Sequence, residues 1–179
     1  MHKNVLSFAE SLTDEQLRWK PDGYSTSIGF HLWRLARESD FLRARILELV
    51  LELGPDFGKA QEIWKQDHLA EKWGFPTSLS ETVGTGMSDD DAANLPLPPK
   101  EELLDYLRRS YQAAEQFVEL LDRKYPVSKE GDADLIKKIQ NIRLNILIFL
   151  AHDGRHLGMM ECLKGLLTGF GSATEKRKS

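Results

Sequence analysis

Two histidines four residues apart are the side chains of this sequence best suited to metal chemistry. His152 and His156 lie in the segment LIFLAHDGRHLGMMECLKGL, whose apolar residues predict a helix. Residues four apart lie on one face of a helix, one turn from each other, so both imidazoles can reach one divalent metal ion. The alternative is a pair of core histidines that hydrogen-bond without a metal, and the spacing alone leaves both interpretations open.

A second group of polar residues lies on the segment 27–40, which also has a helical pattern. His31 and Glu38 share one stripe of this helix, with Arg34 at its edge. His31 and Glu38 can therefore face the same interior as the histidine pair. A simpler interpretation treats Arg34 and Glu38 as an ion pair one turn apart, which contributes about 0.3–0.5 kcal/mol if it is exposed.

The elements that must position these residues are helices. Apolar residues recur at three- and four-residue intervals in four segments, as the buried face of a helix requires. These predicted helices span residues 2–12, 28–53, 100–125 and 132–168. The fold class is therefore all-α, a four-helix bundle with a long crossover between helices 2 and 3.

The crossover, residues 55–99, is rich in proline and glycine and contains one helical piece at 60–72. A connection of this length within a compact domain usually crosses a bundle or shapes a site. We expect a single bundle domain over residues 1–170 and a flexible basic tail over residues 171–179.

The composition excludes several classes of protein. A net charge of −4 argues against nucleic acid as the main partner, because phosphate binding needs a concentrated basic surface. No apolar segment is long enough for a membrane span. The single cysteine, Cys162, excludes an internal disulfide, fits a reducing compartment and is expected to be buried. A soluble, cytoplasmic protein is the expectation.

Two glycines, Gly154 and Gly158, fall on the face of the last helix opposite the histidines. Without side chains there, another backbone can approach closely. This face can dock a neighbouring helix or a second subunit, so a homodimer is a hypothesis from the sequence.

Four segments together resemble the DinB-like family: Ser27–Arg37, Gly84–Ser88, His152–Glu161 and Leu17–Pro21. The likeness covers nearly the whole chain. It implies a DinB/YfiT-like four-helix bundle, often a homodimer, that holds zinc, nickel or iron with one histidine from the second helix and two from the last. Characterised relatives include bacillithiol-type thiol S-transferases and the mycothiol-dependent maleylpyruvate isomerase, so the resemblance also implies a low-molecular-weight thiol.

This sequence departs from the family pattern at the second-helix ligand. His152 and His156 match the pair of the last helix, but Arg34 occupies the position of the remaining histidine. A guanidinium has no lone pair to offer and its charge repels a cation. Either His31, one turn earlier, completes a three-histidine site, or the metal is lost and Arg34, Glu38 and the histidines form a small-anion pocket.

The first of these solutions predicts a metal-dependent enzyme of the thiol-transferase or hydrolase/isomerase type that acts on a small molecule. His31, His152 and His156 are then the ligands, Glu38 supports a ligand or acts as a general base, and Arg34 holds an anionic substrate. The second predicts a metal-free member with no catalysis. A partner-binding module is a third hypothesis, which depends on the Gly154/Gly158 face alone.

Overall fold

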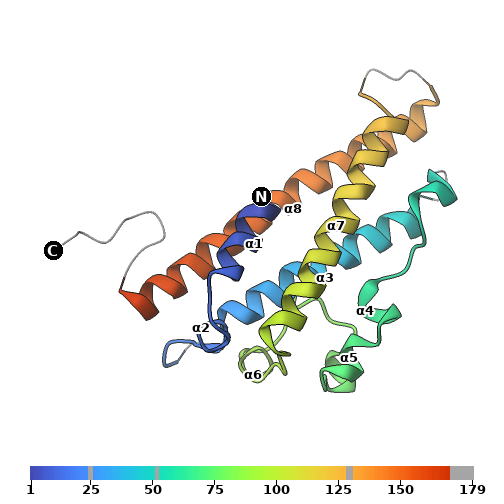
Figure 1. Ribbon diagram of the computed structural model, residues 1–179. Helices are drawn as coiled ribbons and strands as arrows, with labels where there is room; N and C mark the ends of the chain where they lie inside the picture. The colour runs from blue at the N-terminus through green and yellow to red at the C-terminus, as the bar shows by residue number, and fades with distance from the viewer. Residues whose placement is uncertain (24–25, 51–52, 128–130, 170–179) are drawn as a thin grey trace.

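A computed structural model describes residues 1–23, 26–50, 53–127 and 131–169, and within these ranges all regular structure is helical. Four helices form the bundle: α1 (His2–Glu10), α3 (Ile28–Leu49), α7 (Lys100–Lys124) and α8 (Ala133–Thr168). Figure 1 shows α3 beside α7 and α8, with the short α1 on the other side of α7 and α8. The predicted all-α bundle is confirmed, including the long connection between its second and third helices.

Local signals in the sequence set the helix ends. The Ser27 hydroxyl accepts a hydrogen bond from the Phe30 N–H at 3.2 Å, and Asp132 accepts one from the Leu135 N–H at 2.8 Å. These are the side-chain caps that begin α3 and α8. Gly169 ends α8 with a φ of 74°, a left-handed conformation that glycine adopts without strain. The same logic places α2 (Asp14–Arg18), whose capping box joins Thr13 and Gln16.

The core has two parts, and α1 contributes to only one of them. Around Val5 and Ala9 of α1, both fully buried, lie residues of α3, α7 and the C-terminal half of α8. The second part packs Ile46, Phe117 and Ile142 without any residue of α1. Four helices therefore surround the core at one end of the bundle, and three helices surround it at the other end.

Buried charged side chains of α3 bind the crossover through hydrogen bonds and an ion pair. It contains α4 (Ile63–Gln66), α5 (Leu69–Lys72) and α6 (Asp89–Ala93), with 3-10 turns at Pro55–Phe57 and Thr77–Leu79. The predicted single helical piece at 60–72 is divided at His68, whose φ of 52° is left-handed. Asp40, 0 % exposed, accepts hydrogen bonds from the N–H groups of Ile63 (3.0 Å) and Trp64 (2.9 Å), the first residues of α4.

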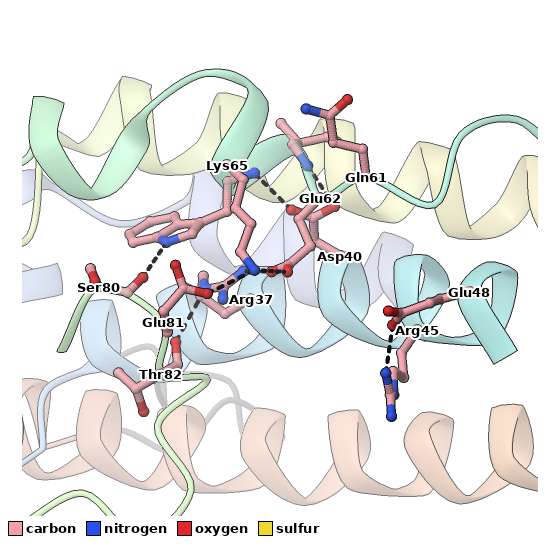
Figure 2. A network of polar contacts seen from close by, with 12 residues as sticks. Arg37, Asp40, Arg45, Glu48, Gln61, Glu62, Lys65, Ser80, Glu81 and Thr82 are labelled. Carbon is pink, nitrogen blue, oxygen red and sulfur yellow. Dashed lines mark hydrogen bonds and ion pairs between the residues drawn. The ribbon is translucent and has the colours of Figure 1, made fainter. Parts of the chain in front are cut away.

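Arg37 joins the crossover to α3 at a second point, shown in Figure 2. Its guanidinium donates to Glu62 Oε2 at 2.8 Å and to the Thr82 carbonyl at 3.2 Å, and it lies 4.7 Å from the Trp64 ring centroid. A buried guanidinium is tolerated only when its donors are satisfied, so these partners fix the path of the crossover over α3.

Some expectations fall outside the described residues or are wrong. The tail at 171–179 lies outside them, and the boundary of the single domain at residue 170 stays a prediction. Cys162 is exposed, not buried, because it lies on the outer face of α8. None of the helices in the described ranges combines the length and the apolar character that crossing a membrane requires.

Replacement of Asp40 by alanine is expected to lower the free energy of unfolding by about 3 kcal/mol or more, because it leaves two N–H groups and the Tyr106 hydroxyl without an acceptor. Urea denaturation measures the change. The control is Glu48→Ala on the same helix, whose 61 % exposed side chain pairs with Arg45 and should change stability by less than about 0.5 kcal/mol. Equal effects of the two substitutions would contradict this account of the crossover.

Candidate metal centre

The two histidines of α8 lie side by side on its inner face, as their spacing predicts. His152 Nε2 and His156 Nε2 are 2.9 Å apart. His156 is buried, whereas His152 lies closer to the surface. Both rings face α3, so any third ligand must come from that helix.

The third atom belongs to Glu38. Its Oε2 lies 2.8 Å from His152 Nε2, and the carboxylate is only 7 % exposed. This oxygen is buried and has no hydrogen-bond partner, since the contact with His152 lacks hydrogen-bond geometry. One ligand atom each of Glu38, His152 and His156 lies within 4.8 Å of the other two.

These three atoms suit a divalent cation in kind and in spacing. Two imidazoles and one carboxylate are a common ligand set of zinc sites that keep a position open. Ligand atoms around a tetrahedral zinc ion, with bonds of about 2.0–2.1 Å, are roughly 3.3–3.4 Å apart. The two contacts at 2.8 and 2.9 Å need to lengthen by only about half an ångström to reach that spacing.

Arg34 holds the other oxygen of the same carboxylate. One guanidinium nitrogen lies 2.8 Å from Glu38 Oε1 and 3.2 Å from the Thr85 hydroxyl, and the other donates to the Gly84 carbonyl at 2.7 Å. Gly84 has a φ of 88°, and its backbone runs directly over the Arg34 side chain. The Gly-Thr-Gly segment of the crossover thus fixes Arg34, and Arg34 turns Glu38 Oε2 toward the histidines.

His31 lies on the opposite side of the His156 ring from this cluster. The two Nδ1 atoms are 2.9 Å apart, whereas His156 faces His152 and Glu38 through Nε2. If His156 Nδ1 carries the proton and donates it to His31, the lone pair of Nε2 is directed at the candidate site. In this arrangement His31 sets the tautomer of His156 and leaves the third position to Glu38.

Arg155 contacts Nδ1 of His152, the ring nitrogen of the α8 histidine pair that faces away from the candidate site. Its guanidinium lies 2.7 Å from His152 Nδ1, and since a guanidinium only donates, Nδ1 is the acceptor. The proton of a neutral His152 ring is then on Nε2, which donates it to His156 Nε2 at 2.9 Å. Metal binding through Nε2 requires that proton to leave and the exposed Arg155 to swing away.

Burial keeps the inner histidines neutral. It lowers the pKa of His31 to about 4 and the pKa of His156 to about 3, and nearby positive charge, including Arg34, acts in the same direction. Burial also raises the pKa of Glu38, against the charges of Arg34 and His152, which lower it. Neutral imidazoles with free lone pairs at physiological pH are the form that binds metal.

Next to the candidate metal site lies a second polar group that the sequence did not reveal. His2 of α1 stacks on Tyr111 with ring centroids 3.7 Å apart, donates from Nδ1 to Glu115 Oε1 at 2.9 Å, and lies 3.5 Å from Asp153 Oδ2. A histidine at the second position of a chain carries no signal for such a role, because only the docking of α1 brings it to α7 and α8.

The structure thus brings together all five residues predicted for the site: His31, Arg34, Glu38, His152 and His156. Glu38, and not His31, is the α3 residue whose ligand atom lies beside the ligand atoms of His152 and His156. Outside the site, the side chain of His68 is 74 % exposed. Gly154 packs near Met1, the N-cap residue of α1, and Gly158 faces open space.

The protein is a helical bundle that carries a His–His–Glu cluster, with Glu38 and His156 buried and His152 half-buried, between α3 and α8. The model of the DinB superfamily matches residues 1–160, and the chain belongs to that superfamily. No curated protein matches the sequence. The family membership confirms the resemblance noted in the sequence.

Acid should destabilise the metal-free protein partly through His31. Its pKa in the folded state is below the value of 6.5 for an exposed histidine, so the unfolded chain binds more protons as the pH falls from about 6.5 to about 4, and stability is lost over that window. Between pH 7 and pH 4 the free energy of unfolding of the variant His31→Gln should fall by about 1–3 kcal/mol less than that of the wild type.

Urea denaturation in the presence of a chelator, repeated across this pH range, measures the difference. His68→Gln replaces an exposed histidine and should keep the wild-type profile. Parallel profiles for His31→Gln and the wild type would show that His31 is not held neutral in the fold.

Proposed function

We propose that this protein is a divalent-metal-dependent enzyme that acts on a small molecule, with Glu38, His152 and His156 as the metal ligands. The observation that carries the proposal is Glu38 Oε2, a buried oxygen without a hydrogen-bond partner that lies 2.8 Å from a histidine nitrogen. A buried carboxylate oxygen that accepts no hydrogen bond is costly, and a cation shared with two imidazoles offsets that cost.

The surrounding residues have distinct roles in this proposal. Arg34 positions Glu38 and is itself held by the crossover, and His31 directs the His156 lone pair. A bound divalent ion, such as zinc, nickel or iron, supplies a Lewis acid that lowers the pKa of a thiol or water reaching it. We propose a reaction of the thiol-transferase type, with hydrolase and isomerase chemistry as the other options, and a low-molecular-weight thiol as the co-substrate.

A metal-free protein is the second candidate, and one observation favours it. Hydrogen bonds can run in a single direction from Arg155 through His152 and His156 to His31, with distances of 2.7, 2.9 and 2.9 Å. These hydrogen bonds satisfy both ring nitrogens of His152 and of His156 without a cation. The pocket would then bind a small anion or have no ligand at all.

Elemental analysis of protein purified without a histidine tag separates the two candidates. We expect about one zinc, nickel or iron ion per chain in the wild type, and none in His152→Ala, which removes a ligand. Glu38→Gln should weaken metal affinity by about tenfold or more, because an amide is a poorer ligand than a carboxylate.

His68→Ala is the matched control, since it removes an exposed histidine far from the cluster and should keep full occupancy. Protein that stays metal-free after zinc, nickel and iron are offered in turn would exclude the enzyme proposal and leave the metal-free pocket.

We further propose that the protein works in the cytoplasm as a homodimer whose interface is the outer face of α8. Five of the large exposed apolar residues in the described part of the chain lie on this helix: Leu144, Leu147, Ile148, Met159 and Leu166. At 100° per residue they share the side that faces away from the core. Exposed apolar residues gathered on one side of a helix are typical of an interface, and here the exposed Arg155 separates Ile148 from Met159 on that side.

Leu147→Glu should convert the dimer to a monomer, because the charge is then buried between two apolar stripes. Light scattering coupled to size exclusion measures the mass. Leu49→Glu, at an equally exposed leucine of α3, should leave the dimer intact. A wild-type protein that is monomeric at high concentration would exclude the dimer.

A further inference from the structure

Arg155 is an exposed arginine that contacts a proposed metal ligand and has no carboxylate partner in the described part of the chain. Its guanidinium lies 2.7 Å from His152 Nδ1. Eight of the ten arginines in the described ranges form an ion pair with a carboxylate: Arg18, Arg34, Arg37, Arg43, Arg45, Arg108, Arg109 and Arg143. Arg123 lies in the last turn of α7, where a positive charge stabilises the helix end. Among these ten, only Arg155 has a charge that neither a carboxylate nor a helix end balances.

Among the described residues, neither its own helix nor the site offers Arg155 a carboxylate. The positions one turn away on α8 are Ala151, His152, Gly158 and Met159, and none of them is acidic. Glu38, across the site on α3, pairs with Arg34 through Oε1 and lies beside His152 through Oε2. Asp153 lies beside His2. An anion that balances Arg155 is therefore supplied by a ligand or by a second chain.

Arg34, the residue that the sequence suggested for an anionic substrate, is already engaged. Its two terminal nitrogens contact Glu38 Oε1, the Gly84 carbonyl and the Thr85 hydroxyl. An anion that binds Arg34 has to displace these contacts, and with them the orientation of Glu38. Arg155 is exposed, and its contact with His152 is one that metal binding breaks.

That contact depends on which nitrogen of His152 carries the ring proton. In the metal-free chain the proton is on Nε2, because Nδ1 accepts from Arg155. When Nε2 binds a metal ion, the proton of the neutral ring is on Nδ1, which then donates. Two donors do not form a hydrogen bond with each other. The guanidinium therefore leaves His152 and meets the solvent at the edge of the site.

The charges gathered at a metal-loaded site are mostly positive. A divalent ion, Arg34 and Arg155 face the single carboxylate of Glu38. Like charges close together repel, and an anion bound among them reduces the repulsion. An exposed guanidinium next to the open side of such a site is well suited to a carboxylate, which it can hold through two parallel hydrogen bonds.

We infer that Arg155 binds an anionic group of the substrate, such as a carboxylate, and that metal binding at His152 frees it to do so. The inference rests on the proposed metal-dependent function and names the substrate class. The substrate is a small molecule whose anionic group reaches Arg155 while another of its groups occupies the open position of the site. Because the two events are linked, the anion and the metal strengthen each other's binding.

Two thiols with the same skeleton test the inference on cobalt-loaded protein. 3-Mercaptopropionate carries a carboxylate, and 3-mercaptopropionamide carries a neutral amide in its place. Each binds the metal through its sulfur after the thiol proton passes to the solvent, and the absorption band of the sulfur–cobalt bond gives the Kd. We expect the wild type to bind the carboxylate about tenfold more tightly than the amide, because a charge-assisted hydrogen bond to Arg155 forms.

Three variants show which residue causes this preference. Arg155→Met removes the charge and should reduce the preference to within about twofold. Arg155→Lys keeps the charge and should keep a preference of about threefold or more. The matched control is Arg123→Met, which removes the other exposed arginine without an ion pair in the described ranges and should keep the wild-type preference.

Cobalt affinity without thiol separates this role from a purely structural one. Arg155→Met should bind cobalt at least about threefold more tightly than the wild type, because its metal-free form has no hydrogen bond at His152 Nδ1 to lose. If Arg155 only orients His152, the same variant binds cobalt more weakly.

The inference is overturned if the wild type does not prefer the carboxylate, if Arg155→Met keeps the preference, or if this variant binds cobalt more weakly. A lower mass of Arg155→Met than of the wild type in light scattering also overturns it, because the partner of Arg155 then lies on a second subunit. Cobalt binding without a preference between the thiols removes the anion site and leaves the metal site. A wild type that binds no cobalt removes the metal site and, with it, this inference.

Discussion

The ion pair between Arg34 and Glu38 is the interaction on which the site depends. Both side chains are largely buried, at 16 % and 10 % exposed, and a buried carboxylate needs a partner to stay ionised. Arg34 takes one oxygen and thereby orients the other toward His152 and His156. Arg34, which the resemblance in the sequence places at a ligand position, is thus the residue that positions Glu38, the ligand proposed here, one turn further along α3.

That pair depends in turn on the crossover. The backbone of Gly84 and the hydroxyl of Thr85 hold the Arg34 guanidinium, and Arg37 and Asp40 anchor the rest of the crossover on the same helix (Figure 2). Three charged residues of α3 at intervals of three, Arg34, Arg37 and Asp40, therefore link the crossover to the helix that carries Glu38. Rigid support of this kind keeps ligand atoms close to a productive geometry.

Much of the fold follows from local patterns in the sequence. The predicted ranges 28–53 and 132–168 place the starts of α3 and α8 and the end of α8 to within a residue, because the caps Ser27 and Asp132 and the left-handed Gly169 act over one helical turn. The break at His68 was missed, since a left-handed histidine has no sequence signal. The burial expected for Cys162 was wrong because periodicity along α8 does not say which of its faces meets the other helices.

The site was predictable in its members but not in its geometry. Helical spacing brought His31, Arg34 and Glu38 to one side of α3, and His152 and His156 to one side of α8. Which nitrogen of His156 faces which neighbour depends on the rotation and depth of two packed helices, to within an ångström. Spacing cannot supply that precision. The role of His2 does not follow from any local pattern, since it depends on where α1 docks against α7 and α8.

X-ray absorption spectroscopy of the zinc-loaded protein tests the central claim most directly, because it distinguishes imidazole from carboxylate ligands. The account predicts two imidazoles and one carboxylate around the metal, with one imidazole lost in His156→Ala and the carboxylate lost in Glu38→Gln. A spectrum with three imidazoles, unchanged by Glu38→Gln, would place His31 in the third position and contradict it.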